Sequence, residues 1–146
     1  PSSHLLYNKD YDYIFGKYKK ISEGNDALII STGSVSGQAK LASENLKKQN
    51  INVGLINCHT IKPFDEGILS EIHKHNNIII VEEHSIVGGL NSIISELLSK
   101  NSIHKKILSI TLPDKFGPTG DYNYLLNYHG LSHDKILSQI KEFLAT

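Results

Sequence analysis

Apolar runs alternate along the chain with segments in which apolar residues recur every three or four positions. The runs are rich in Ile, Val and Leu without polar alternation, which is typical of strands buried on both faces. They occupy residues 27–31, 51–57, 76–81 and 105–113. A further stretch, FGKYKKIS (15–22), alternates apolar and basic residues and predicts an edge or half-exposed strand.

Helical spacing separates these predicted strands. After Thr32-Gly33-Ser34 the apolar positions are four, three and four apart, as one helical face requires; they are Val35, Ala39, Ala42 and Leu46. Residues 65–75 predict a shorter helix with Ile68, Leu69 and Ile72 on one side, and 88–100 a helix that buries Leu90, Ile93, Ile94 and Leu97. Two short helices, around 121–129 and 132–144, end the chain, with Gly130 between them and Ser132 as N-cap.

The alternation of buried strands and helices predicts an α/β domain. We expect a three-layer α/β/α arrangement around a mostly parallel sheet of roughly five strands, joined by right-handed crossovers. The predicted domain covers residues 13–146, and residues 1–12 form an irregular lead-in without a clear period.

The balance of charge excludes several classes of partner. Fifteen Lys face fifteen Asp and Glu, so no broad attraction to nucleic acid or to an acidic membrane is expected. No apolar run approaches the roughly 20 residues of a transmembrane helix. The single cysteine, Cys58, excludes an internal disulfide framework and suits a reducing cytoplasm, which is the expected location.

The chain contains no Arg, the usual bidentate clamp for phosphate and carboxylate groups. A self-contained enzyme of phosphosugars or nucleotides without Arg would be unusual. The composition therefore indicates that any such chemistry resides elsewhere.

The segment STGSVSG (31–37) lies between a buried strand and a helix start, where backbone amides can hold an anion. It lacks the spacing and the Lys of a Walker loop and the glycines of a dinucleotide fingerprint. It also misses the GxSxG nucleophile elbow by one position. A tight turn with a Ser cap accounts for the same residues.

The segment VEEHSIVGG (81–89) places two carboxylates, a histidine and two glycines at a strand end. Strand ends of an open α/β sheet lie at its carboxyl edge, where ligands usually bind. Adjacent Glu82 and Glu83 would point to opposite sides if the strand continued, so they do not form an obvious acid/base pair. Gly88-Gly89 permits close backbone approach and opens the next helix. The spacing favours a structural or interface role over catalysis.

The eight histidines do not predict a metal site. His73 and His75 are two positions apart on a helix end and point to different sides. Gly130 breaks the helix between His129 and His133, and Cys58 alone offers no thiolate pair.

Four ordered motifs carry a resemblance over residues 13–145. They are DALIISTGS (26–34), INCHTIKPFD (56–65), VEEHSIVGGLNS (81–92) and PDKFGPTGDYNYLLNYHGLS (113–132). Together they resemble the C-terminal domain of the transketolase family of thiamine-diphosphate enzymes, which includes deoxyxylulose-phosphate synthases, 2-oxo acid dehydrogenase beta subunits and two-chain transketolases. Glu82-Glu83-His84, Phe116-Gly117 and Gly120-Asp121 are most similar to transketolases proper. Residues 1–12 and Ser85 match no part of the pattern.

The resemblance implies an enzyme that transfers two-carbon ketol units between phosphosugars, a transferase of the pentose phosphate pathway. In that family thiamine diphosphate and Mg are held by a diphosphate-binding and a pyrimidine-binding domain. The diphosphate signature GDG is missing, although Asn76-Asn77 occurs. The resemblance thus implies a chain that binds no cofactor alone, is inactive alone, and packs against those upstream domains or a partner subunit in a homodimeric enzyme.

We therefore expect no catalytic, cofactor-binding or metal-binding residues in this chain, and a set of interface or ligand-edge residues instead. These are Thr32, Gly33, Ser34, Glu82, Glu83, His84, Gly88, Gly89, Asp114, Gly120 and Asp121. Two alternatives stay open. One is a stand-alone module that binds a phosphorylated ligand or nucleotide at the strand-to-helix turns. The other is a small hydrolase using Ser34 or Ser36 with His84.

Overall fold

The computed structural model describes residues 5–7 and 11–146 of the chain. The strands are β1 (Lys19–Ser22), β2 (Ala27–Thr32), β3 (Val53–Asn57), β4 (Asn77–Ser85) and β5 (Lys106–Leu112). The helices are α1 (Ser36–Lys47), the 3₁₀ turn η1 (Glu66–Ile68), α2 (Leu69–His73), α3 (Leu90–Lys100), α4 (Tyr122–Tyr128) and α5 (His133–Ala145). The predicted α/β class is confirmed.

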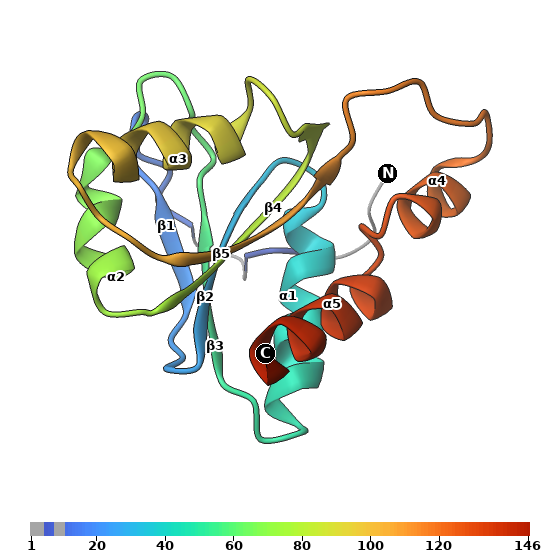
Figure 1. Cartoon of the computed structure of the whole chain (residues 1–146), viewed down its shortest axis with the longest axis horizontal. Coiled ribbons are helices and arrows are strands. Elements are labelled where there is room, and N and C mark those ends of the chain that lie inside the picture. Colours follow the sequence, from blue (N-terminus) through green and yellow to red (C-terminus); the bar gives the residue numbers. More distant parts are fainter. Residues whose placement is uncertain (1–4, 8–10) are drawn as a thin grey trace.

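The strands form one sheet in the order β1-β3-β2-β4-β5. All neighbours pair in parallel except β1, which lies antiparallel to β3 at the edge. Helices α1 and α5 cover one face of this sheet, and α2 and α3 cover the other (Figure 1). The predicted three-layer, mostly parallel, five-stranded arrangement is therefore confirmed.

Strand β4 supplies the centre of the core. Ile78, Ile79, Ile80 and Val81 are fully buried. Because successive strand side chains point to opposite faces, Ile79 and Val81 pack with α1 and α5, whereas Ile78 and Ile80 pack with α2 and α3. This alternation fixes the direction of the residues that follow in the strand.

Some element boundaries and some buried positions differ from the sequence predictions; β1, for example, begins at Lys19, four residues after the predicted start. β4 continues to Ser85, four residues beyond the predicted end. The predicted helix 65–75 is a 3₁₀ turn followed by one short α-helix. Leu69 and Ile93 are only partly buried, whereas Leu98, which the helical pattern omitted, is buried.

The chain ends follow the sequence predictions in part. Gly130, with a φ of 76°, separates α4 from α5, and Ser132 occupies the N-cap position without a side-chain bond to the helix. Within the predicted lead-in 1–12, residues 1–4 and 8–10 lie outside the described residues, and 5–7, 11 and 12 form neither helix nor strand. No helix in the described part of the chain is long and apolar enough to cross a membrane.

Candidate functional site

The predicted interface or ligand-edge residues gather at the carboxyl edge of the sheet, toward the top of Figure 1. Parallel strands bring their carboxyl ends to one edge. The register pairs Thr32 of β2 with Glu82 of β4 and Ser85 of β4 with Leu112 of β5. The segments 32–34, 82–89 and 113–121 therefore meet along this edge.

Glu82 is a buried carboxylate that caps helix α3. Its side chain is 1% exposed and accepts hydrogen bonds from the backbone N–H groups of Leu90 (2.7 Å) and Asn91 (2.8 Å). The first N–H groups of a helix have no partner within the helix, and the helix dipole favours negative charge there. Glu82 therefore secures α3 to the end of β4.

Gly89 leaves the space that this carboxylate occupies. A Cβ at position 89 would lie 2.3 Å from Glu82 Oε2 and 2.8 Å from His84 Nδ1. Gly88, with a φ of 88°, donates its N–H to Ser92 Oγ at 2.8 Å. The expected close backbone approach is present at Gly89, where its partner is the Glu82 side chain, whereas a Cβ at Gly88 would meet nothing within 4 Å.

Glu83 points to the opposite face, as strand alternation predicts once β4 continues past it. Its Oε2 accepts hydrogen bonds from Ser34 Oγ at 2.6 Å and from the Tyr122 hydroxyl at 2.8 Å. The Ser34 and Tyr122 hydroxyl oxygens lie 3.1 Å apart. Burial raises the pKa of Tyr122; the Ser34 contact opposes this rise and the Glu83 carboxylate adds to it. We call Ser34, Glu83 and Tyr122 the Glu83 cluster; it ties the α1 turn and α4 to β4.

The turn between β2 and α1 differs from its predicted Ser cap. The N-cap position is Val35, and no side chain caps the helix. Thr32 Oγ1 donates to the Cys58 carbonyl at 2.7 Å, and Gly33 makes the turn with a φ of 73°. Ser34 Oγ donates to Glu83 instead. This carboxylate disfavours a phosphate at the turn, because two anions would share one small site.

The hydrolase alternative finds no support in the geometry. His84 Nδ1 lies 2.9 Å from the carbonyl of Ser85, and Ser36 Oγ donates to Asn57 Oδ1 at 3.1 Å in the protein interior. Neither candidate serine hydroxyl has a hydrogen bond to His84. A serine–histidine pair requires that contact.

The loop between β5 and α4 holds the remaining predicted residues. Asp121 caps α4 by accepting the Tyr124 N–H at 2.9 Å, and a Cβ at Gly120 would lie 2.3 Å from the Tyr124 ring. A cavity of about 440 Å³ opens beside this loop. It is lined by Ser85, Leu112, Pro113, Asp114, Lys115, Phe116, Gly117 and His129. Asp114 thus borders a cavity, whereas Gly120 and Asp121 shape the start of a helix.

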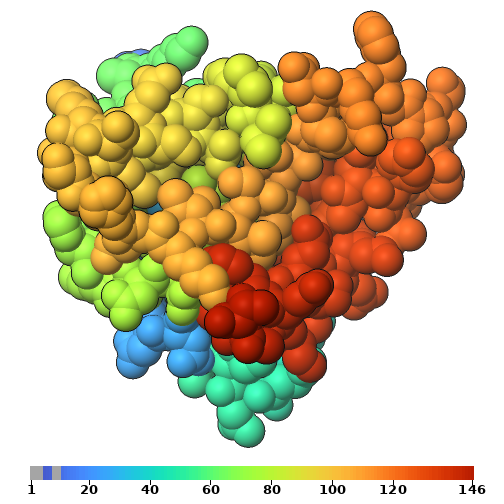
Figure 2. Space-filling model, in the orientation of Figure 1, coloured from blue at the N-terminus to red at the C-terminus, as the bar shows by residue number. Residues whose placement is uncertain are grey.

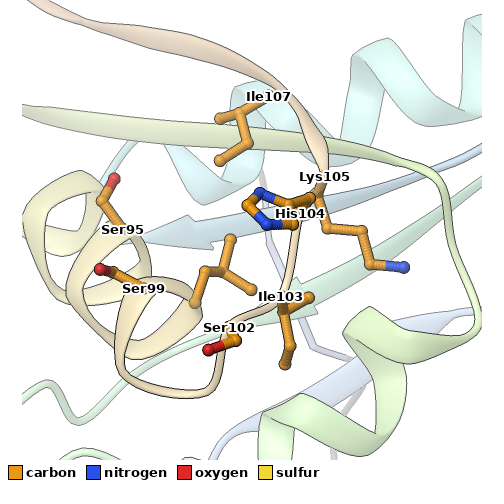
Figure 3. A pocket seen from close by; sticks show the side chains of 8 residues that line it. Ser95, Ser99, Ser102, Ile103, His104, Lys105 and Ile107 are labelled. Carbon is orange, nitrogen blue, oxygen red and sulfur yellow. The ribbon is translucent and has the colours of Figure 1, made fainter.

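Two polar features away from this edge were not predicted from the sequence. A cavity of about 430 Å³ lies at the end of α3, bordered by Ser95, Ser99 and Ser102. In Figure 3 the Lys105 ammonium group points away from these serines, and it donates to the His75 carbonyl at 2.7 Å. This cavity faces the carbonyl end of the helix, which disfavours an anion.

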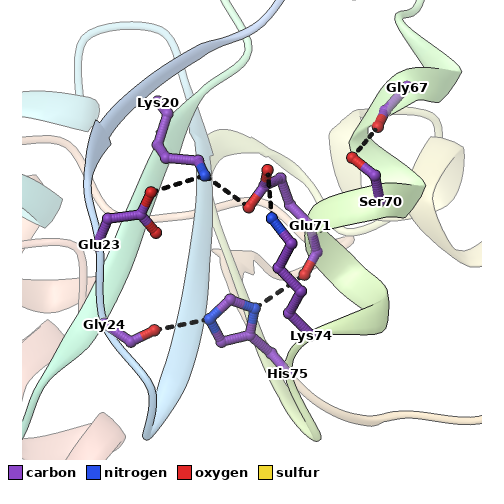
Figure 4. A network of polar contacts seen from close by, with 8 residues as sticks. All are labelled: Lys20, Glu23, Gly24, Gly67, Ser70, Glu71, Lys74 and His75. Atoms are coloured by element: carbon purple, nitrogen blue, oxygen red, sulfur yellow. Dashed lines mark hydrogen bonds and ion pairs between the residues drawn. The ribbon is translucent and has the colours of Figure 1, made fainter.

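The second feature is an ionic network between β1 and α2, centred on the buried Glu71 (Figure 4). Lys20 Nζ lies 2.8 Å from Glu71 Oε2, and Lys74 Nζ lies 3.1 Å from Glu71 Oε1. Lys20 beside Glu71 lowers the pKa of that carboxyl, and Glu71 together with Glu23 raises the pKa of Lys20 to about 12. Both ring nitrogens of His75 face backbone carbonyls, those of Glu71 and Gly24.

These contacts make His75 part of the packed structure, whereas His73 is exposed. Among residues 5–7 and 11–146, no three His, Cys, Asp or Glu side chains are grouped so that they could hold a metal ion. Cys58 is buried, and burial, with a smaller contribution from Asp65, raises the pKa of its thiol to about 12.

Comparison with known proteins identifies the family. The family described as "Transketolase, C-terminal domain" matches residues 16–136, and the chain belongs to this family. A candidate "transketolase C-terminal section" from Methanocaldococcus jannaschii is 35% identical over 142 residues, covering 96% of this chain and 44% of that protein. The 6-deoxy-6-sulfo-D-fructose transketolase subunit of Clostridium sp. (strain MSTE9) is 33% identical over 90% of this chain and 41% of its own length.

Other relatives are longer enzymes. The 1-deoxy-D-xylulose-5-phosphate synthase of Aquifex aeolicus is 31% identical over 88% of this chain but only 21% of the enzyme. Among solved structures, a split-gene transketolase, described as an inactive beta4 tetramer, matches with a TM-score of 0.83 at 25% identity, covering 97% of this chain and 45% of that chain. The chain thus spans less than half the length of these relatives.

The described residues do not fit a site for thiamine diphosphate with its magnesium ion. They contain no metal-ligating cluster, and the two strand-end carboxylates already accept hydrogen bonds from the chain's own groups. Magnesium is usually bound through one or two protein carboxylates, with water and substrate phosphate oxygens as its other ligands.

Proposed function

We propose that this chain is the non-catalytic C-terminal section of a transketolase-type enzyme that transfers two-carbon ketol units between phosphosugars. The observation that carries the proposal is that both strand-end carboxylates bind groups of the chain's own helices and turns. Glu82 caps α3 and Glu83 ties α1 and α4 to β4. In this proposal the motif that resembles an acid/base site shapes an edge for docking.

The rest of the proposed enzyme supplies the chemistry. Its diphosphate-binding and pyrimidine-binding parts, as upstream domains or as a partner subunit, would hold thiamine diphosphate and magnesium, and the assembled enzyme would be a homodimer in the cytoplasm. The length of the relatives supports a missing remainder, because this chain covers 44% or less of the two curated transketolase relatives. The split-gene transketolase supports inactivity of a chain alone, since its beta4 form is described as inactive.

Ketol transfer measured on three samples tests this proposal. The chain alone and the remainder of its enzyme alone should be inactive with a donor ketose phosphate and an acceptor aldose phosphate, and their mixture should be active. Turnover by the chain alone would overturn the non-catalytic role. An active remainder that gains nothing from this chain would overturn the role in assembly.

His84→Ala in the assembled enzyme tests whether His84 serves only in docking or also lies in the substrate channel. The His84 ring contacts the Ser85 carbonyl and is exposed. We expect unchanged turnover from this variant. Reduced turnover with intact assembly would instead give His84 a place beside the substrate.

A further inference from the structure

The large hydrophobic side chains that stay exposed are unevenly distributed over the described residues. They are Leu5, Tyr13, Ile14, Phe15, Ile86, Val87, Phe116, Tyr124 and Tyr128. Eight of them, Tyr13 to Tyr128 in this list, lie at the carboxyl edge of the sheet or on α4 beside it, and the carbonyl of Leu5 accepts from Lys40 of α1. Scattered exposed apolar residues are ordinary, but a concentration of them on one side marks an interaction surface.

One group lies at the β1 end of this edge. Tyr13, Ile14 and Phe15 precede β1, and Phe15 is 67% exposed. Because β1 runs antiparallel to β3, its first residue, Lys19, pairs with Asn57 at the carboxyl end of β3. The side chains before β1 are therefore at the same edge as the ends of the parallel strands.

The second group lies at the β5 end, around the 440 Å³ cavity. Ile86 donates its N–H to the Leu112 carbonyl at 2.8 Å, which joins the end of β4 to the start of the next loop. Val87 is 65% exposed, and the Phe116 side chain is fully exposed. In Figure 2 the orange segment that contains this loop projects from the upper right of the molecule.

Helix α4 continues the second group. Tyr124 and Tyr128 contact each other, with ring centroids 6.0 Å apart, and Tyr128 contacts His129, which lines the cavity. The Glu83 cluster holds α4 through Tyr122. The exposed aromatic side chains are therefore attached to a fixed helix.

The opposite, amino edge of the sheet has a different character. Its turns occupy residues 23–26, 48–52, 74–76 and 101–105 and consist mainly of Lys, Glu, Asp, Asn and Ser. In the described part of the chain, none of these turns carries an exposed large hydrophobic side chain. The amino edge is thus suited to contact with water, and the carboxyl edge to contact with another protein surface.

We propose that the carboxyl edge is the surface through which this chain binds the remainder of its own transketolase-type enzyme, with Phe15 and Phe116 as anchors at its two ends. The proposal rests on the proposed function and adds the surface and its occupant. The occupant follows from chain length, because the relatives extend to more than twice the length matched here. Exposed aromatic side chains are the usual energetic centres of such interfaces.

Co-purification tests the proposal directly. The full 146-residue chain is co-expressed with the tagged remainder of its enzyme as a second polypeptide, and the dissociation constant of the purified pair is measured. Phe15→Ser and Phe116→Ser should each weaken binding at least tenfold, about the effect of losing one aromatic anchor. Leu5→Ser is the matched control, because Leu5 is 83% exposed but belongs to neither group of the proposed surface; its carbonyl accepts from Lys40 of α1, and the variant should bind like the wild type.

Thermal unfolding of each variant checks that its fold is intact, since an exposed side chain contributes little to stability. Wild-type binding that neither Phe variant weakens would overturn the proposed surface and leave the proposed function standing. No wild-type binding at all would overturn both. Loss of self-association by the two Phe variants, with unchanged binding to the remainder, would make a second copy of this chain the occupant and overturn the proposal.

Discussion

Replacing Glu82 with glutamine tests whether this carboxylate is a structural cap. The side chain is 1% exposed, and its two oxygens accept hydrogen bonds from Leu90 N and Asn91 N. Glutamine keeps the shape of the side chain but replaces one acceptor oxygen with an amino group. That amino group would face a backbone N–H, so one buried donor loses its partner.

The size of the effect follows from two contributions. A buried donor left without a partner costs about 1–3 kcal/mol. Loss of the negative charge at the start of α3 removes up to about 2 kcal/mol. Glu82→Gln should therefore lower the free energy of unfolding by about 2–4 kcal/mol, which moves the urea midpoint down by about 1–2 M for a protein of this size.

Glu83→Gln is the matched control, because it makes the same chemical change at the neighbouring position on the other face. Both hydroxyl donors contact one oxygen, Glu83 Oε2, and the glutamine oxygen can accept from both. The expected loss is below about 1 kcal/mol. Urea unfolding followed by circular dichroism measures both variants. Equal losses, or a Glu82→Gln variant as stable as the wild type, would refute the assigned cap.

Three further predictions concern Gly89, Glu71 and Cys58. Gly89→Ala should lower the free energy of unfolding by about 2–4 kcal/mol, because its Cβ would lie 2.3 Å from Glu82 Oε2. A loss under about 1 kcal/mol in urea unfolding, the size of a well-tolerated core substitution, would contradict the close packing. Lys20 holds the pKa of Glu71 below its ordinary value of 4.5, so the pair stabilises the fold above that pH and its contribution falls as the pH drops through the lowered pKa. Urea midpoints measured below pH 4.5 should show a weaker acid dependence in Glu71→Gln, and an unchanged dependence would remove the role of this pair. Burial raises the pKa of the Cys58 thiol to about 12, so a thiol reagent at neutral pH should react with it only after urea is added; rapid labelling of the folded chain would be the opposite result.

Helical and strand periods were sufficient to predict the layers of the fold. The face formed by Val35, Ala39, Ala42 and Leu46 is buried as its spacing predicts. The antiparallel direction of β1 could not be predicted, because a four-residue edge strand contains no signal for the direction of its partner. Direction is set by the tertiary pairing with β3.

At the end of β4 the local sequence pattern no longer predicts the structure. Charged residues after NNIIIV predicted a strand end near Val81, yet the strand continues to Ser85 because β5 pairs with it there. Alternation did predict that Glu82 and Glu83 point apart. It could not predict that Glu82 is buried, since the capped groups come from α3, eight and nine residues away.

Long-range partners explain the other differences. A Ser cap was expected in the turn 31–37, but no side chain caps α1, and the Ser34 hydroxyl donates to Glu83, 49 positions along the chain. Tyr122 and His129 were not among the predicted site residues, because no spacing connects them with β4. A resemblance that spans several ordered motifs pointed to the edge, whereas the contacts within the edge depend on the folded chain.

Calorimetric titration with thiamine diphosphate and magnesium tests the central claim most directly. The chain alone should give no binding heat, and the chain mixed with the remainder of its enzyme should bind the cofactor saturably and acquire ketol transfer. Tight binding by this chain alone would contradict the account, because the cofactor would then have a site among residues assigned here to docking and structure.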